Sequence, residues 1–159
     1  AMKAVNVKPN WLNPVHLLAF GFGSGAAPKA PGTFGTIAAV LFYWPLSQLS
    51  LDYYLLMILV TSVMGIYLCG KTAEDLGVHD HGGIVWDEFV GFWITMIAAP
   101  VGWIWVLVGF VLFRFFDIIK PWPISWIDKK ISGGLGIMLD DVIAGVMAAL
   151  VLQGLAWWL

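Results

Sequence analysis

Six carboxylates lie within or beside apolar stretches of this 159-residue sequence. They are Asp80, Asp87, Glu88, Asp117, Asp140 and Asp141. A charged side chain at the centre of a bilayer costs about 2.5–3.5 kcal/mol on insertion scales, so a set of this size indicates bound metal, mutual pairing or a water-filled cavity. The alternative, that each lies in the lipid headgroup region, stays open for any single carboxylate.

Carboxylate oxygens are the ligands that Mg²⁺ prefers, usually together with water and substrate phosphate. Adjacent acids point about 100° apart on a helix, but they can still border one hydrophilic pocket. We predict that Mg²⁺ is bound by the two adjacent pairs, and that Asp80 or Asp117 assists an attacking water. The pairs are Asp87-Glu88 and Asp140-Asp141. For Asp140-Asp141, acids near a helix start that offset the helix dipole are the competing interpretation.

Basic side chains follow one of these acids at helical spacing. Arg114, Asp117 and Lys120 are three residues apart and would share one helix face. They are either an intrahelical ion pair with a snorkelling lysine, or a site in which Arg114 and Lys120 hold phosphate oxygens.

Three further residues are weaker candidates for phosphate binding: Ser24, Lys29 and Thr33. The backbone amides of Gly23-Ser24-Gly25 can cradle phosphate, although glycines near a membrane more often indicate close packing or a turn. His79-Asp80-His81 is a weak metal pattern, and a polar loop is the better interpretation.

The composition identifies the surroundings of these residues. The chain is 60% hydrophobic and 11% charged, with a mean hydropathy of +0.87, whereas soluble domains are about 45–50% apolar and about 25% charged. We therefore predict a membrane protein. A net charge of −2 with eight Lys and Arg excludes the broad basic surface that nucleic acid binding needs.

Five apolar stretches follow one another along the chain: 33–49, 53–70, 84–99, 103–119 and 137–159. Residues 84–119 would span about 54 Å as one helix, against a hydrocarbon core of about 30 Å, so we divide them at Pro100-Val101-Gly102. The prediction is an all-α, polytopic helical membrane protein with about five membrane-spanning helices. Residues 1–32 form an N-terminal interfacial or re-entrant segment, and residues 1–159 form one membrane-embedded domain.

The charges support this count of spans. With the amino terminus inside, only Asp52 of the charged residues lies on the outer side, and all eight Lys and Arg lie on or near the inner side. This satisfies the positive-inside rule. The three acidic clusters and Arg114 then meet at the cytoplasmic face.

Several phosphatase classes lack their residues here. Cys69 is followed six positions later by Asp75 where a cysteine phosphatase needs arginine, and Arg114 is the single arginine. The sequence contains no Asp-x-Asp pair to serve as nucleophile and acid. These absences favour metal-assisted hydrolysis.

Four strings together resemble the bacterial phosphatidylglycerophosphatase A family: residues 23–33, Trp86–Gly91, Phe113–Ile124 and Gly136–Gly145. Asp-Glu, Arg-x-x-Asp-x-x-Lys-Pro and Asp-Asp-x-x-Ala-Gly in that order are specific, whereas each alone is not. The resemblance implies Mg²⁺-dependent hydrolysis of phosphatidylglycerophosphate to phosphatidylglycerol. It places this reaction in the bacterial cytoplasmic (inner) membrane, at the cytoplasmic leaflet, with membrane lipid as the other partner.

Two other functions compete. A small ion-coupled transporter would use the same carboxylates as a proton or cation path, but here the charges gather at one face and not at the bilayer midplane. A lipid phosphotransferase that uses a cytidine nucleotide ranks last, because its Asp-Gly-x-x-Ala-Arg signature is missing from the sequence.

Overall fold

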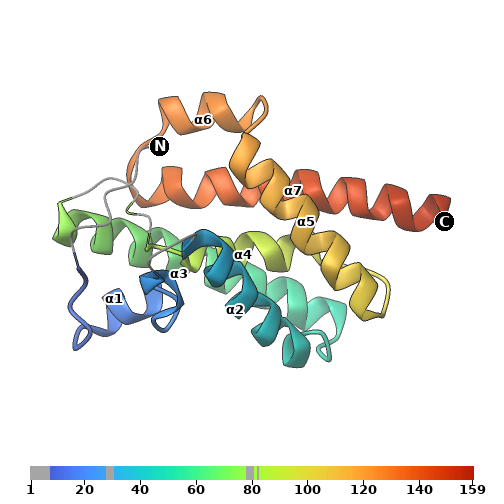
Figure 1. The fold of residues 1–159 in the computed structure, drawn as a ribbon, viewed down its shortest axis with the longest axis horizontal. Helices are drawn as coiled ribbons and strands as arrows, with labels where there is room; N and C mark the ends of the chain where they lie inside the picture. The colour runs from blue at the N-terminus through green and yellow to red at the C-terminus, as the bar shows by residue number, and fades with distance from the viewer. Residues whose placement is uncertain (1–7, 28–30, 78–80, 82) are drawn as a thin grey trace.

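The computed structural model describes residues 8–27, 31–77, 81 and 83–159, and every regular element in this part of the chain is helical. The elements are α1 (Pro14–Ala19), the 3₁₀ helix η1 (Ser24–Ala26), α2 (Pro31–Leu46), α3 (Leu51–Leu76), α4 (Trp86–Thr95), α5 (Trp103–Ile119), α6 (Ile124–Lys130) and α7 (Gly133–Trp158) (Figure 1). The all-α prediction is confirmed for the described residues.

Helices α3 and α7 extend along the long axis of the molecule and contact each other (Figure 1). Each has 26 residues, about 39 Å at 1.5 Å per residue, and both are long and apolar enough to cross a membrane. The other three predicted spans contain shorter helices, with 16 residues in α2, 10 in α4 and 17 in α5. Helix length and composition therefore support two spans, and the count of five stays a prediction.

Helix α4 is the centre of the fold. All ten of its residues are buried, and it contacts α2, α3, α5 and α7. Two indoles attach it to its neighbours, because Trp86 Nε1 donates to the carbonyl of Thr61 at 3.0 Å and Trp93 Nε1 donates to that of Ala39 at 3.1 Å. Such bonds satisfy the buried indole N–H groups and fix the rotation of α4 about its axis.

The helix is shorter than the predicted span 84–99, since it begins at Trp86 and ends at Thr95. Before it, Val85 N–H donates to the carbonyl of Ala19 at 2.8 Å. After it, the chain turns through Ala98 and Gly102, which have φ of 54° and 132°. The predicted break at 100–102 is thus present. Helix α4 reaches about 15 Å. The backbone before it is buried at Ile84 and Val85, whereas the turn after it is exposed at Ala98, Val101 and Gly102.

The amino-terminal part contains α1 and η1. Asn13 caps α1, with its side chain accepting from Val15 N–H at 2.9 Å, and α1 packs against α3. Gly25 in η1 lies so close to the carbonyl of Gly83 that a Cβ at position 25 would be 2.0 Å from that oxygen. The segment is thereby attached to the chain just before α4. Its interfacial or re-entrant position stays a prediction.

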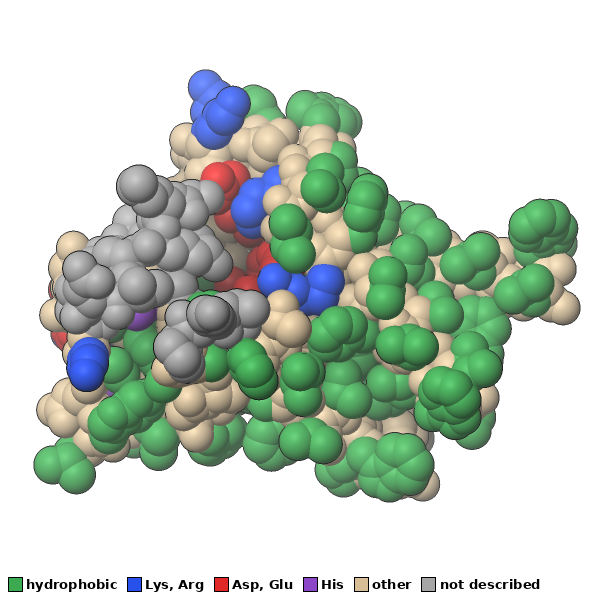
Figure 2. Space-filling view, in the orientation of Figure 1, with side chains coloured by type: hydrophobic (Ala, Val, Ile, Leu, Met, Phe, Trp, Pro, Cys, Tyr) green, Lys and Arg blue, Asp and Glu red, His purple; other side chains and the backbone are tan. Residues whose placement is uncertain are grey.

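Large apolar side chains cover the outside of the long helices. Examples exposed by half or more are Leu41 and Trp44 on α2, Leu59 and Val63 on α3, Leu107 and Val111 on α5, and Leu150 on α7. Figure 2 shows this apolar surface over the part of the molecule away from the charged side chains. An exposed apolar surface of this extent indicates contact with lipid.

Small residues let α4 and α7 approach closely. A Cβ at Gly145 would be 2.5 Å from the carbonyl oxygen of Gly91, and Thr95 Oγ1 lies 3.4 Å from the carbonyl of Gly145. Glycine is required on both helices because a side chain there would meet backbone, which cannot rotate away. This contact determines how far Asp141, one turn earlier on α7, lies from the start of α4.

We expect Gly145→Ala to lower the free energy of unfolding by about 1–3 kcal/mol, since the added methyl group must push α4 and α7 apart. Chemical denaturation in mild detergent measures this change. Gly154→Ala is the matched control on the same helix, because no atom lies within 4 Å of its Cβ position. Equal stability of the two variants would contradict the proposed close contact.

Candidate metal and phosphate site

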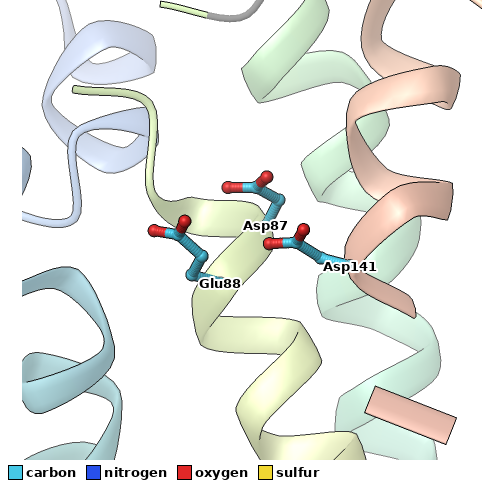
Figure 3. Close-up of side chains that lie close together, drawn as sticks. All are labelled: Asp87, Glu88 and Asp141. Atoms are coloured by element: carbon cyan, nitrogen blue, oxygen red, sulfur yellow. The ribbon is translucent and has the colours of Figure 1, made fainter. Parts of the chain in front are cut away.

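Three carboxylates meet in the interior of the protein. Each of Asp87, Glu88 and Asp141 offers an oxygen, and these oxygens all lie within 4.8 Å of one another. Figure 3 shows the three side chains together, two from the start of α4 and one from α7. The residues are only 6%, 2% and 2% exposed. We call these three residues the carboxylate trio.

The position of two acids at the start of α4 is only partly explained by the helix itself. Asp87 and Glu88 lie in the first turn of α4, where the free amide groups and the helix dipole favour negative charge. That effect is worth about 0.3–1 kcal/mol per acid, which is small against the cost of burying several like charges. The helix start therefore does not by itself explain the trio.

Two cations lie beside the trio: Arg114 on α5, and Lys120 directly after the end of α5. Arg114 Nη1 lies 3.4 Å from Glu88 Oε1 and also donates to Asp117 Oδ2, and Lys120 Nζ lies 3.9 Å from Asp117 Oδ1. Figure 2 shows acidic side chains in a hollow of the surface with Lys and Arg side chains at its edge. The intrahelical ion pairs predicted from the spacing of Arg114, Asp117 and Lys120 are present, and Arg114 also reaches Glu88 on α4. Phosphate binding by Arg114 and Lys120 stays a prediction.

Lys120 is directed to this site by the way α5 ends. It has a left-handed backbone with φ of 51° and ψ of 59°, and its N–H donates to the carbonyl of Phe116. Burial lowers the pKa of the Lys120 ammonium, but the carboxylates of Asp141, Asp117 and Asp140 outweigh this effect and raise the pKa above its usual range. Lys120 therefore stays cationic at neutral pH.

Sequence reasoning missed the part played by Gly32, in the first turn of α2. A Cβ at Gly32 would be 2.9 Å from Glu88 Oε1 and 3.1 Å from Arg114 Nη1. The start of α2 consequently lies against the pair that joins α4 to α5. The signal in the sequence was a glycine directly after Pro31, at the beginning of an apolar stretch.

The buried charges do not balance. Asp87, Glu88, Asp117, Asp140 and Asp141 are all buried. Within the described residues the cations beside them are Arg114 and Lys120, so ionised carboxylates leave an excess of three negative charges there. Asp141 Oδ2 is buried without a hydrogen-bond partner in the described part of the chain. Such a cluster needs protons or a bound cation.

The donor atoms fit a hard divalent cation. Oxygen ligands alone, supplied by Asp87, Glu88 and Asp141, are typical of Mg²⁺ sites, whereas zinc sites use His and Cys. Asp140, the fourth predicted ligand, is buried beside Asp141 but lies outside the trio. Its carboxylate nevertheless acts on the same Lys120 ammonium as those of Asp141 and Asp117, so Asp140 borders the site.

The remaining predicted residues have different positions. The Ser24 hydroxyl donates to the carbonyl of Gly21 at 2.9 Å, so its hydrogen is used within its own turn. Thr33 is half-buried in the first turn of α2, next to Gly32. Lys29 and Asp80 lie outside the described residues, as does His79. His81 is buried, and its Nδ1 accepts from Gly83 N–H at 2.9 Å.

Comparison with known proteins confirms the resemblance noted from the sequence. The family described as phosphatidylglycerophosphatase A matches residues 17–156. A protein of this name from Escherichia coli (strain K12) is 54% identical over 138 residues, 86% of this chain and 80% of that protein. A second, from Haemophilus influenzae, is 49% identical over 96% of this chain and 94% of that protein.

A more distant relative carries another name. The Bacteroides thetaiotaomicron protein is 38% identical over 94% of this chain and 97% of its own length, and it is named, provisionally, as a phosphatidylinositol-3-phosphatase. No solved structure matches this chain.

Replacing Arg114 by Met tests the charge balance. The variant removes one of the two cations beside the buried carboxylates, and breaking a buried ion pair typically costs about 3–5 kcal/mol. We expect a smaller loss at pH 5 than at pH 8, because protons at low pH replace the missing positive charge. Denaturation at both pH values measures it, with Lys129→Met on the exposed part of α6 as the control. Equal losses at both pH values would contradict the proposed imbalance.

Proposed function

We propose that this chain, which belongs to the phosphatidylglycerophosphatase A family, hydrolyses the terminal phosphomonoester of phosphatidylglycerophosphate to phosphatidylglycerol and inorganic phosphate. The observation that carries the proposal is the buried carboxylate trio beside Arg114 and Lys120. Buried carboxylates beside an arginine and a lysine, in a chain of this family, suit a substrate whose phosphomonoester is a dianion at neutral pH.

Mg²⁺ is the proposed cofactor, held by Asp87, Glu88 and Asp141, with Asp140 as the remaining sequence candidate. Bound there, it would neutralise charge on the phosphate and make a water molecule more acidic. The support is the all-oxygen donor set and the excess of buried negative charge. The carboxylates themselves exclude other anions until a cation is present, since like charges repel strongly in a buried site.

Arg114 and Lys120 are the proposed phosphate-binding residues. The guanidinium has five N–H donors, and in the described residues the buried Nε has no hydrogen-bond partner, so the side chain has donors left for phosphate oxygens. Thr33 and the backbone amides at the start of α2 are next to Gly32 in the chain, and the Cβ position of Gly32 lies 3.1 Å from Arg114 Nη1. Lys29 and Ser24 stay sequence candidates for the same role.

Asp117 lies between Arg114 and Lys120, within ion-pair distance of both, which suits it to position these two cations. The role of assisting water stays with the two carboxylates predicted for it, Asp80 or Asp117. In the proposed step, water attacks phosphorus and Asp80 or Asp117 accepts a proton of the water. The bond from phosphorus to the glycerol oxygen breaks as that oxygen takes up a proton and leaves as the hydroxyl of phosphatidylglycerol.

For the membrane, we propose one multi-pass domain of five crossings formed by α2, α3, α4, α5 and α7, with α1 and η1 at the inner interface. The apolar exposed surface and the two long helices support this placement. The shorter helices fit a bilayer only if they lie among protein neighbours and their ends lie in the interface. The site then faces the cytoplasmic side of the bacterial inner membrane.

The ion-coupled transporter is not supported by the family to which the chain belongs. A different lipid phosphate is the more relevant competitor, because the Bacteroides relative is named for phosphatidylinositol 3-phosphate. Both lipids carry a phosphomonoester beyond a phosphodiester, so the substrate assay must compare them.

Purified protein is expected to release phosphate from phosphatidylglycerophosphate with Mg²⁺ and to lose this activity with EDTA. Asp87→Asn and Asp141→Asn are each expected to lower kcat/KM at least about hundredfold through lost metal binding. Asp52→Asn, an exposed acid in the first turn of α3, serves as the control. No turnover with any divalent cation, or faster turnover of phosphatidylinositol 3-phosphate, would overturn the assignment.

Cysteine labelling tests the membrane placement. In a Cys69→Ala background, Val101→Cys and Lys130→Cys, both at exposed positions, are expected to react with membrane-impermeant reagents from opposite sides of the membrane. Lys130 should label from the cytoplasmic side, consistent with the positive-inside rule. Labelling of both positions from one side would rule out the hairpin of α4 and α5.

A further inference from the structure

A pocket of about 450 Å³ lies near the carboxylate site but is distinct from it. Its walls include Lys8, Trp11, Phe20, Pro31, His81 and Gly83, and none of the trio lines it. The volume is within the range of about 300–1,000 Å³ that is usual for small-ligand sites. A lipid headgroup is therefore a suitable size of occupant.

Two residues of the pocket wall, Pro31 and Gly83, are close along the chain to residues of the carboxylate site. Pro31 precedes Gly32, whose Cβ position is 2.9 Å from Glu88 Oε1, and Gly83 stands four residues before Asp87. Pro31 and Gly83 therefore connect the wall of the pocket to the segments that carry the carboxylate site. The pocket is adjacent to the site along both of these segments.

The lining combines positive charge with aromatic surface. Lys8 supplies an ammonium group. His81 Nδ1 accepts from Gly83 N–H, which fixes the orientation of the imidazole in the wall of the pocket. On the aromatic side, Phe20 contacts Trp11 edge-on at 5.7 Å between ring centroids and His81 at 5.3 Å. This chemistry suits a singly charged anion attached to a carbon skeleton.

The amino-terminal wall is held in place by a buried histidine. Asn10 N–H donates to His16 Nδ1 at 3.0 Å, and His16 Nε2 lies 3.0 Å from Asp75 Oδ2 near the end of α3. Lys71 Nζ also pairs with Asp75 at 3.0 Å. Residues next to Lys8 and Trp11 are therefore attached to a long helix, as expected for a built pocket.

We propose that this pocket binds the phosphodiester and the glycerol of the lipid headgroup while the phosphomonoester lies at the trio. The proposal rests on the function proposed above. That substrate carries two phosphate groups, and Arg114 with Lys120 serve the one that is removed. Lys8 then contacts the phosphodiester that remains, and it becomes a residue that distinguishes a lipid headgroup from free phosphate.

The test compares the substrate with inorganic phosphate, the product that lacks a phosphodiester. For Lys8→Ala in neutral detergent we expect KM for phosphatidylglycerophosphate to rise about three- to tenfold, as is typical for the loss of a partly exposed charge-assisted contact. The expected kcat and the inhibition constant for inorganic phosphate are unchanged. Lys8→Arg should restore KM, and Lys129→Ala, an exposed lysine of α6, should leave it unchanged.

Each outcome decides the proposal. A rise of KM and of the inhibition constant together would place Lys8 at the phosphomonoester and overturn the assignment, as would an unchanged KM. An effect that appears only in vesicles with other anionic lipids would mean that the pocket holds a neighbouring headgroup, which also overturns it. An inactive wild-type protein would refute the proposed function itself, and the Lys8 variants would not be needed to see this.

Discussion

The burial of five carboxylates beside two cations is the constraint on which the rest of the structure depends. In a medium of low dielectric constant, an uncompensated charge costs several kcal/mol, so these side chains must be close to opposite charge. Arg114 on α5 supplies part of this opposite charge, because it forms an ion pair with Glu88 on α4. The remaining negative charge is an unfavourable feature for a structural core and a favourable one for a site that binds a cation and then a phosphate.

The fold meets this constraint by placing a short helix at its centre. Because α4 is buried on all sides, its first turn can present Asp87 and Glu88 deep within the protein and not at the surface. Glycines at the crossing with α7 bring Asp141 to the same place. The long apolar helices around α4 supply the dry surroundings, and their outer faces suit lipid. Chemistry and membrane packing therefore depend on the same arrangement of helices.

The carboxylate trio and the neighbouring pocket are formed by different parts of the chain. The trio and its cations come from α4, α5 and α7, whereas the neighbouring pocket is formed mainly by the amino-terminal segment and the residues before α4. Pro31 and Gly32 join the two.

The sequence by itself determined what depends on composition and on neighbours along the chain. An apolar composition with few charges indicated helices in a membrane, the turn at 100–102 followed from length, and Arg114, Asp117 and Lys120 were predicted to share a face from their spacing. Tertiary structure alone decided that Asp141 and not Asp140 joins the trio, that Gly32 lies against Arg114, and that α4 has only ten residues. The reason is that these outcomes depend on the rotation and crossing of helices, which are decided by contacts such as Gly91 with Gly145 between residues far apart in the chain.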